Sequence, residues 1–203
     1  MKTKRYLLLM AFSSILFSSC KKESTKDSSD YPYYFTATIN GSAVKYEADD
    51  LNSLYGSGTS QPENSIGFDN YDIYEGTLLQ KMTGEYENSI YVHILKHFTH
   101  EPSSSERAGM ITIGNYGYGV SNSDNSTVNG ASIEYYDANG DSWTTETGTQ
   151  TGSTFQITEL VDNNDGTSGK IFKASFSCKL YNSDGTQSIQ LTNGVIRGKI
   201  LSP

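Results

Sequence analysis

Alternation of apolar and polar residues is the dominant pattern of the chain from residue 33 onward. Residues 33–39 read YYFTATI, in which Phe35, Ala37 and Ile39 occupy every second position. The pair at 40–41 is Asn-Gly, and a second alternating segment follows it at 43–47. A period of two is that of a half-buried strand, and Asn-Gly favours the tight turn that joins two antiparallel strands. The pattern therefore predicts a β-hairpin at the start of the domain.

Similar short segments recur to the C-terminus and are separated by residues that favour turns, such as Asp184-Gly185. Residues 51–64, rich in Ser, Gly and Asn, are predicted to form a loop. The further predicted strands are 65–71, 77–82, 89–98, 109–114, 131–138, 141–147, 153–161, 170–181 and 187–201. About ten short strands at this spacing predict an all-β fold, an antiparallel β-sandwich of the jelly-roll or immunoglobulin-like kind.

The first nineteen residues have a different pattern. A short cationic start at 1–5 precedes an apolar run at 6–17, which is shorter than the roughly 20 residues needed to cross a membrane. Ser18, Ser19 and Cys20 follow, and this segment resembles the lipobox of bacterial lipoproteins. The resemblance implies that residues 1–19 are a cleaved signal peptide and that Cys20 carries the lipid, with palmitate among the acyl groups. The alternative is an ordinary secretory signal followed by a coincidental cysteine.

The predicted organisation after cleavage is a tether and one domain. Residues 20–32 contain the acylated cysteine and a polar segment without apolar periodicity, which is typical of a flexible linker. Residues 33–203 are long enough for a single β-sandwich domain. If Cys20 is lipidated, Cys178 has no partner within the chain, and its place in an alternating segment predicts a buried free thiol.

Composition supports the β fold and narrows the possible partners. The chain has 15 Tyr and 19 Gly, which is typical of a turn-rich β protein. Its net charge is −8, and removal of the signal, with three basic residues and no acidic ones, makes the charge −11. An acidic protein of this kind repels polyanions, so the sequence predicts no nucleic-acid partner.

Four segments resemble uncharacterised envelope lipoproteins of the Bacteroidota. The opening segment 35–41 is similar to the first strand and turn of that family, and segments 152–160, 169–182 and 189–194 are similar to the strands and turns that close its β-sandwich. The resemblance implies a lipid-anchored protein of the outer membrane, in either the periplasmic or the surface-facing leaflet. It implies no particular activity and no site residues.

The three histidines of the chain are close together in the sequence, at His93, His97 and His100. On a helix these spacings would place all three on one face, as in many metal sites. Residues 89–95, however, are rich in β-branched and aromatic residues and predict a strand. His93 and His97 would then share a face while His100 lies in the following loop. We expect ordinary strand and loop histidines, with metal binding as the weaker alternative.

A second candidate site is an aromatic pair beside a carboxylate. If Asn139-Gly140 forms a two-residue turn, Tyr136 lies directly opposite Trp143, and Glu134 shares their face. Two rings and a carboxylate would suit stacking against a sugar, which makes these three residues candidate ligand-binding residues. The alternative, which we favour, is a cross-strand aromatic pair facing the core.

Sequence motifs for catalysis are missing from the chain. It contains no Gly-x-Ser-x-Gly, His-Glu-x-x-His, Cys-x-x-Cys or phosphate-loop pattern, and nothing in it predicts a cofactor. The leading hypothesis is a non-enzymatic, membrane-anchored lipoprotein that binds a glycan or a protein. The alternatives are a structural or accessory envelope protein without a small-molecule ligand and, less favoured, a hydrolase on a sandwich scaffold, whose two carboxylates a sequence does not reveal.

Overall fold

The computed structural model describes residues 31–48, 55–60, 63–65, 70–81, 87–122, 126–163 and 169–200. The predicted signal peptide, Cys20 and nearly all of the predicted tether lie outside these residues. No helix in the described part of the chain is long and apolar enough to cross a membrane.

The structure is built almost entirely of strands. The strands are β1 (Tyr33–Ile39), β2 (Ser42–Ala48), β3 (Tyr55–Ser60), β4 (Glu63–Ser65), β5 (Tyr71–Lys81), β6 (Ser89–Phe98), β7 (Gly114–Tyr116), β8 (Gly130–Tyr136), β9 (Ser142–Thr144), β10 (Thr154–Asp162), β11 (Lys170–Tyr181) and β12 (Ser188–Ile200). One short helix, α1 (Ser104–Ala108), follows β6.

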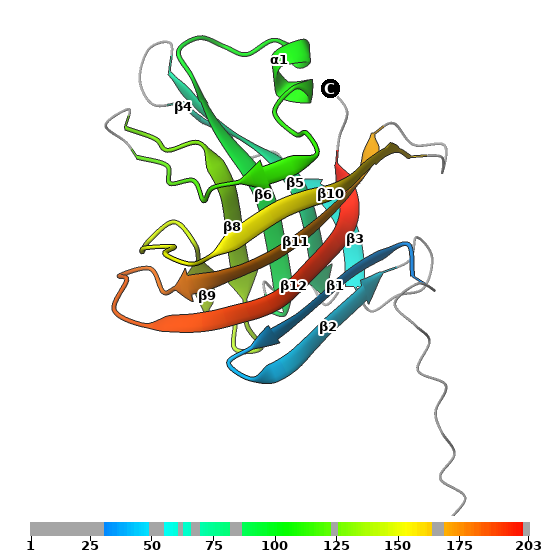
Figure 1. Cartoon of the computed structure of the whole chain (residues 1–203), viewed down its shortest axis with the longest axis vertical. Helices are drawn as coiled ribbons and strands as arrows, with labels where there is room; N and C mark the ends of the chain where they lie inside the picture. The colour runs from blue at the N-terminus through cyan, green and yellow to red at the C-terminus, as the bar shows by residue number, and fades with distance from the viewer. Residues whose placement is uncertain are drawn as a thin grey trace, which may run out of the picture.

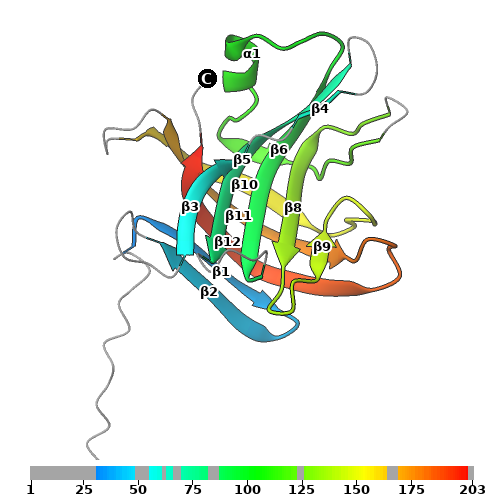
Figure 2. The same ribbon diagram turned by 180° about the vertical axis from the view of Figure 1, so that it is seen from behind.

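All named strands belong to one antiparallel sheet that is curled into a half-barrel. The main order is β2-β1-β12-β11-β9-β8-β6-β5-β3. Outside this order, β10 pairs with β11 along one edge and with β7 along the other. In Figure 1 strands β10, β11, β12, β1 and β2 form a front layer that crosses obliquely over β3, β5, β6 and β8. Figure 2 shows the second layer from its own side. The predicted all-β, antiparallel, sandwich-like fold is confirmed.

The core lies between the two layers and follows from the alternation in the sequence. Along β1 every second residue is buried, beginning with Tyr33. The rings of Phe155 and Phe176 stack with centroids 5.7 Å apart, and Phe176 stacks in turn on Phe35 at 6.3 Å. Stacked rings of this size bury much apolar surface and hold the front layer together. Cys178 is a buried free thiol, as predicted, and burial raises its pKa to about 12.

A bulge in β12 helps the front layer to curl. The pairing registers of β12 with β1 and with β11 both shift close to Asn193 and Gly194. Asn193 has φ of +52°, and a Cβ atom on Gly194 would lie 2.6 Å from the Phe176 ring. An extra residue in one strand bends that strand and increases its twist. The residues at this bulge, 193–195, line the groove described below.

Two predictions for the segment before β6 were wrong. Residues 55–60 and 63–64, predicted to be a loop, lie in β3 and β4, which pair with β5. Backbone pairing needs no apolar side chains, so a segment rich in Ser and Gly can supply an edge strand. Residues 66–69 of the strand predicted at 65–71 lie outside the described part of the chain. The break predicted between that strand and the one at 77–82 does not exist, because the single strand β5 runs from Tyr71 to Lys81. That strand continues through Gly76, where a Cβ atom would lie 2.0 Å from the carbonyl oxygen of Val92.

The strand predicted at 109–114 was also wrong. The chain forms α1 just before this segment, and only Gly114 enters a strand, β7. Ser103 caps the helix by accepting from the backbone N–H of Glu106, whose side chain accepts from the Ser103 backbone N–H in return. This capping box satisfies free backbone donors at the first turn and explains where the helix begins.

Candidate functional site

The predicted pairing of Tyr136 with Trp143 was wrong by one residue. Trp143 lies opposite Tyr135, and Tyr136 lies opposite Ser142. The connection is longer than a two-residue turn, because its closing backbone hydrogen bond joins the N–H of Asp137 to the carbonyl of Asp141. A shift of one residue moves a side chain to the other face of a sheet.

Trp143 and Tyr136 therefore point to opposite faces. Trp143 is half-buried and packs against the core, as we favoured, and its indole N–H donates to Asp137 Oδ2 at 3.3 Å. Tyr136 lies on the outer face of the second layer together with Glu134. The Tyr136 hydroxyl donates to Glu134 Oε1 at 2.8 Å, and Ser142 Oγ donates to the same oxygen at 3.1 Å. Tyr136 therefore lies beside the Glu134 carboxylate, but Trp143 is not its aromatic partner.

Tyr91 takes the place that was predicted for Trp143. It lies directly opposite Glu134 in the β6–β8 pairing, and its ring is edge-to-face with Tyr136 at a centroid distance of 6.0 Å. Burial and the neighbouring Glu134 carboxylate raise the pKa of Tyr136 to about 12. The row of rings continues from Tyr91 to His93, with ring centroids 6.1 Å apart. It ends at Tyr74, whose ring centroid lies 5.7 Å from that of His93.

His93 is buried at the centre of this row. Burial lowers its pKa to about 4, because the charged imidazolium loses its hydration there. Its Nε2 atom has no hydrogen-bond partner in the described part of the chain. His93 is therefore neutral at physiological pH.

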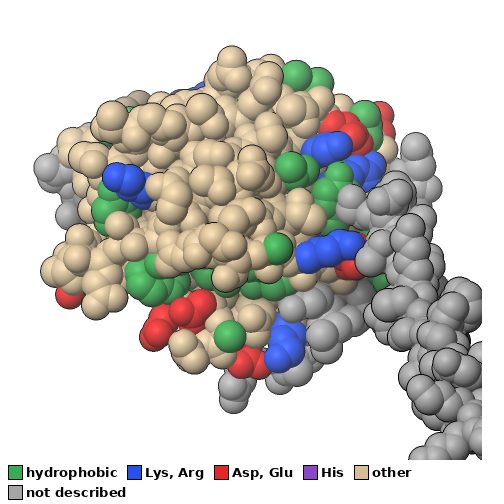
Figure 3. All heavy atoms as spheres, turned by 60° about the horizontal axis from the view of Figure 1, so that its bottom comes forward, with side chains coloured by type: hydrophobic (Ala, Val, Ile, Leu, Met, Phe, Trp, Pro, Cys, Tyr) green, Lys and Arg blue, Asp and Glu red, His purple; other side chains and the backbone are tan. Residues whose placement is uncertain are grey.

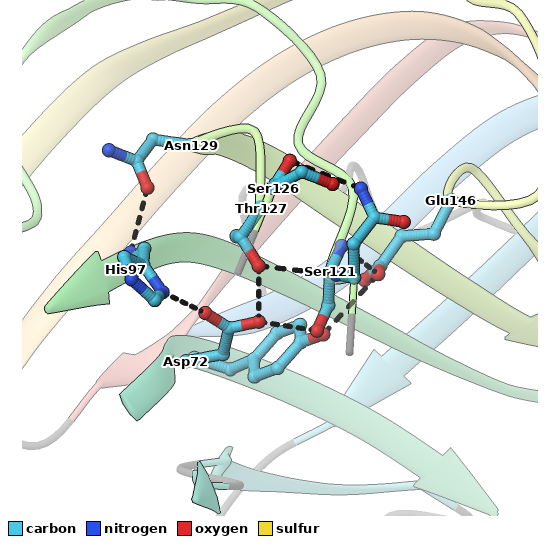
Figure 4. A network of polar contacts seen from close by, with 9 residues as sticks. Asp72, His97, Ser121, Ser126, Thr127, Asn129 and Glu146 are labelled. Atoms are coloured by element: carbon cyan, nitrogen blue, oxygen red, sulfur yellow. Dashed lines mark hydrogen bonds and ion pairs between the residues drawn. The ribbon is translucent and has the colours of Figure 1, made fainter. Parts of the chain in front are cut away.

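A network of polar contacts lies farther along the same outer face, next to His97 (Figure 4). At its centre is Asp72 of β5, which is fully buried. Its Oδ1 atom contacts His97 Nδ1 at 2.8 Å, and its Oδ2 atom accepts from Thr127 Oγ1 at 2.6 Å and from Ser121 Oγ. Three partners compensate the carboxylate for the loss of water.

Glu146 extends the network toward Tyr74. One carboxylate oxygen accepts from the Ser121 backbone N–H at 3.0 Å and from the Tyr74 hydroxyl at 3.3 Å, and the other accepts from Ser132 Oγ. The buried Asp72 carboxylate and the half-buried Glu146 carboxylate thus hold the connection between β7 and β8 against the outer face of the sheet. Their oxygens are engaged with protein donors, which indicates a structural role.

The three histidines do not form one ligand set. His93 and His97 lie on the same face of β6, as predicted for a strand, but His97 contacts Asp72 whereas His93 packs between tyrosines. His100 lies after the strand and contacts Glu106 Oε1 at 2.9 Å. Among the described residues, no group of three or more His, Cys, Asp or Glu side chains is arranged to hold a metal ion.

A groove of about 520 Å³ lies on the front layer, over β10, β11 and β12. Ten residues line it: Asn115, Thr154, Phe155, Gln156, Ser175, Phe176, Ser177, Asn193, Gly194 and Val195. Most of the lining side chains are amides or hydroxyls, and none is charged. Figure 3 shows that much of the molecular surface in that view carries neither charged nor apolar side chains.

The groove is supported from within by Tyr118. Its hydroxyl donates to the carbonyl oxygens of Thr154 at 3.1 Å and Ser177 at 3.3 Å, on the two neighbouring strands β10 and β11. Its ring meets Phe155 edge-to-face at a centroid distance of 6.2 Å. These contacts fix the spacing of the strands that carry the groove.

Comparisons with protein-family models, with curated proteins and with solved structures gave no match. Among the described residues, the groove over β10–β12 and the cluster of Tyr91, Glu134 and Tyr136 are candidate ligand sites, and neither was fully anticipated from the sequence.

Proposed function

We propose that this protein is an envelope lipoprotein, anchored through a lipid on Cys20, whose β domain binds a neutral glycan without catalysing a reaction. The observation that carries this proposal is the groove over β10–β12, which is lined mostly by amide and hydroxyl side chains and by no charged group. The lipobox-like segment and the resemblance to envelope lipoproteins support the location.

The chemistry of the lining matches a sugar. Hydroxyl and amide side chains both donate and accept hydrogen bonds, as the hydroxyl groups of a glycan do. A neutral ligand enters such a groove without desolvating a charge. The net charge of −8 disfavours anionic glycans at the same surface.

The groove is also preorganised. Gln156 of β10 lies directly opposite Ser175 of β11, and Ser175 lies opposite Val195 of β12. The polar side chains therefore stand on paired strands rather than on a loop. A rigid site loses less conformational freedom when a ligand binds.

The same lining supports binding rather than hydrolysis. Glycoside hydrolysis usually requires two carboxyl groups that flank the scissile bond. The groove residues include neither Asp nor Glu. The Asp72 and Glu146 carboxylates lie away from the groove, on the side of the second layer, and accept hydrogen bonds from protein donors.

A glycan array probed with residues 21–203 tests this proposal. We expect neutral oligosaccharides to be retained and Gln156→Ala to weaken the best ligand about tenfold, as the loss of one or two hydrogen bonds to a ligand does. Thr158→Ala, an exposed position on the same strand outside the lining, serves as the matched control. Retention of no glycan, or equal effects of the two substitutions, would contradict a glycan site in this groove and favour an accessory envelope role.

A further inference from the structure

The outer face of β6, β8 and β9 carries a second polar cluster, which we call the tyrosine–glutamate site and define as Tyr91, Glu134, Tyr136 and Ser142. Tyr91 lies directly opposite Glu134, and Ser142 lies directly opposite Tyr136. All four side chains are half-buried or exposed. The site lies in the layer opposite to the groove and shares no residue with it.

The carboxylate of this site is oriented but not neutralised. Both of its hydrogen bonds, from Tyr136 and from Ser142, end on Glu134 Oε1. This leaves Oε2 as the acceptor for an incoming N–H group. Glu134 forms no ion pair with a Lys or Arg of the described residues. The site therefore presents a carboxylate that no Lys or Arg of the described residues neutralises, beside two aromatic rings.

Buried polar atoms on the same face of β6 provide an independent observation. Ser89 Oγ and His93 Nε2, on either side of Tyr91, have no hydrogen-bond partner in the described part of the chain. Ser89 is fully buried and lies directly opposite Tyr136. Nearly all buried polar atoms in native proteins have a partner, and exceptions are often found at functional sites.

We propose that the tyrosine–glutamate site binds a guanidinium group, presented by an arginine side chain of a partner protein. The faces of Tyr91 and Tyr136 attract a cation through their ring quadrupoles. Glu134 Oε2 would accept a charge-assisted hydrogen bond. A planar guanidinium can stack on an aromatic ring and at the same time donate hydrogen bonds in its own plane, which a lysine ammonium does not do.

The overall charge of the molecule favours the same partner. At a net charge of −8, the protein attracts basic surfaces, and the attraction weakens with added salt. Because the site lies on the opposite layer, this inference does not depend on the glycan groove. Either proposal can fail while the other holds.

The test compares N-acetyl-arginine amide with N-acetyl-citrulline amide, its uncharged counterpart, by NMR titration of the isotope-labelled protein. We expect arginine amide to shift the signals of residues 91, 134 and 136, and citrulline amide to bind at least about fivefold more weakly. Equal binding of the two compounds, or no shift at these residues, would overturn the proposal.

Two variants separate a local site from general electrostatics. Glu134→Gln removes the charge but keeps an oxygen that accepts from Tyr136, so the fold is preserved. Asp184→Asn removes one negative charge from an exposed turn between β11 and β12. We expect only Glu134→Gln to weaken arginine amide, by about fivefold or more. Equal weakening by both variants would show nonspecific charge attraction and contradict the site.

Discussion

Protonation of His93 provides a sharp test of the buried aromatic row. The folded-state pKa is about 4, below the ordinary value of 6.5, because burial disfavours the charged ring. Between these values the unfolded chain binds a proton that the folded protein does not. The contribution of His93 to stability is therefore fully present above pH 6.5 and is lost as the pH falls toward 4. The difference in pKa corresponds to about 3 kcal/mol.

His93→Phe isolates this effect. Phenylalanine keeps a flat ring beside Tyr74 and Tyr91 but has no titratable group. We expect the wild type to lose about 3 kcal/mol more unfolding free energy than the variant between about pH 8 and about pH 4. Urea unfolding at each pH, followed by circular dichroism, measures this difference. The other ionisable groups are present in both proteins, so their contributions to the difference cancel.

Comparing how the unfolding free energies of the two proteins change with pH also corrects for any change in packing caused by the substitution. A ring that fits poorly lowers the stability of the variant at every pH by the same amount, and this shift does not alter the difference between the two pH values. Parallel stability curves for wild type and variant would refute the assignment of His93 as a buried neutral histidine. A steeper curve for the variant would refute it equally.

Three further predictions concern the network, the tryptophan and the anchor. Asp72→Ala removes a buried carboxylate that three half-buried side chains contact and should lower the unfolding free energy by about 3 kcal/mol or more in urea unfolding; a loss below about 1 kcal/mol would contradict the network. Trp143 packs against the core, so its fluorescence should be blue-shifted and poorly quenched by iodide, and Trp143→Ala should destabilise the protein by about 3 kcal/mol; emission like that of free indole would argue against this packing. Cys20→Ser should abolish labelling of cells by an alkyne fatty acid, and equal labelling of the mutant and the wild type would exclude lipidation at this residue.

The parts of the fold that the sequence predicted correctly are those where alternation and turn chemistry agree. The opening hairpin is one example, since the pairs run in register from Tyr33 with Ala48 to Ile39 with Ser42. Asn40 and Gly41 have the positive φ values that their turn requires. The long strands β11 and β12 were also predicted, because every second residue in much of each is buried.

The wrong predictions arise where burial depends on distant segments. Asp72 and Glu75 lie in the stretch 72–76 that was predicted to separate two strands, whereas β5 runs through it. Both side chains are in fact buried, and Asp72 is covered by the connection that contains Ser121 and Thr127. No local pattern shows that a segment fifty residues farther along the chain covers a strand. By contrast, the capping box of Ser103 and Glu106 was readable and would have predicted α1.

The candidate sites were only partly predictable for the same reason. Glu134 and Tyr136 were identified as neighbours, but their third member, Tyr91, comes from a strand whose pairing the sequence does not state. The polar residues of the groove, such as Gln156 and Ser175, alternate visibly with buried residues. Their meeting in one hollow depends on the pairing of β10 with β11 and on the bulge in β12.

The most direct test of the glycan proposal is a chemical-shift map of the domain bound to the best neutral oligosaccharide from the array. The account predicts that the shifted backbone signals fall at 154–156, 175–177 and 193–195, on the three strands of the groove. It also predicts that they spare Tyr91 and Tyr136 on the opposite layer. Shifts confined to those tyrosines, or no shift at the groove strands, would contradict the claim that the groove is the ligand site.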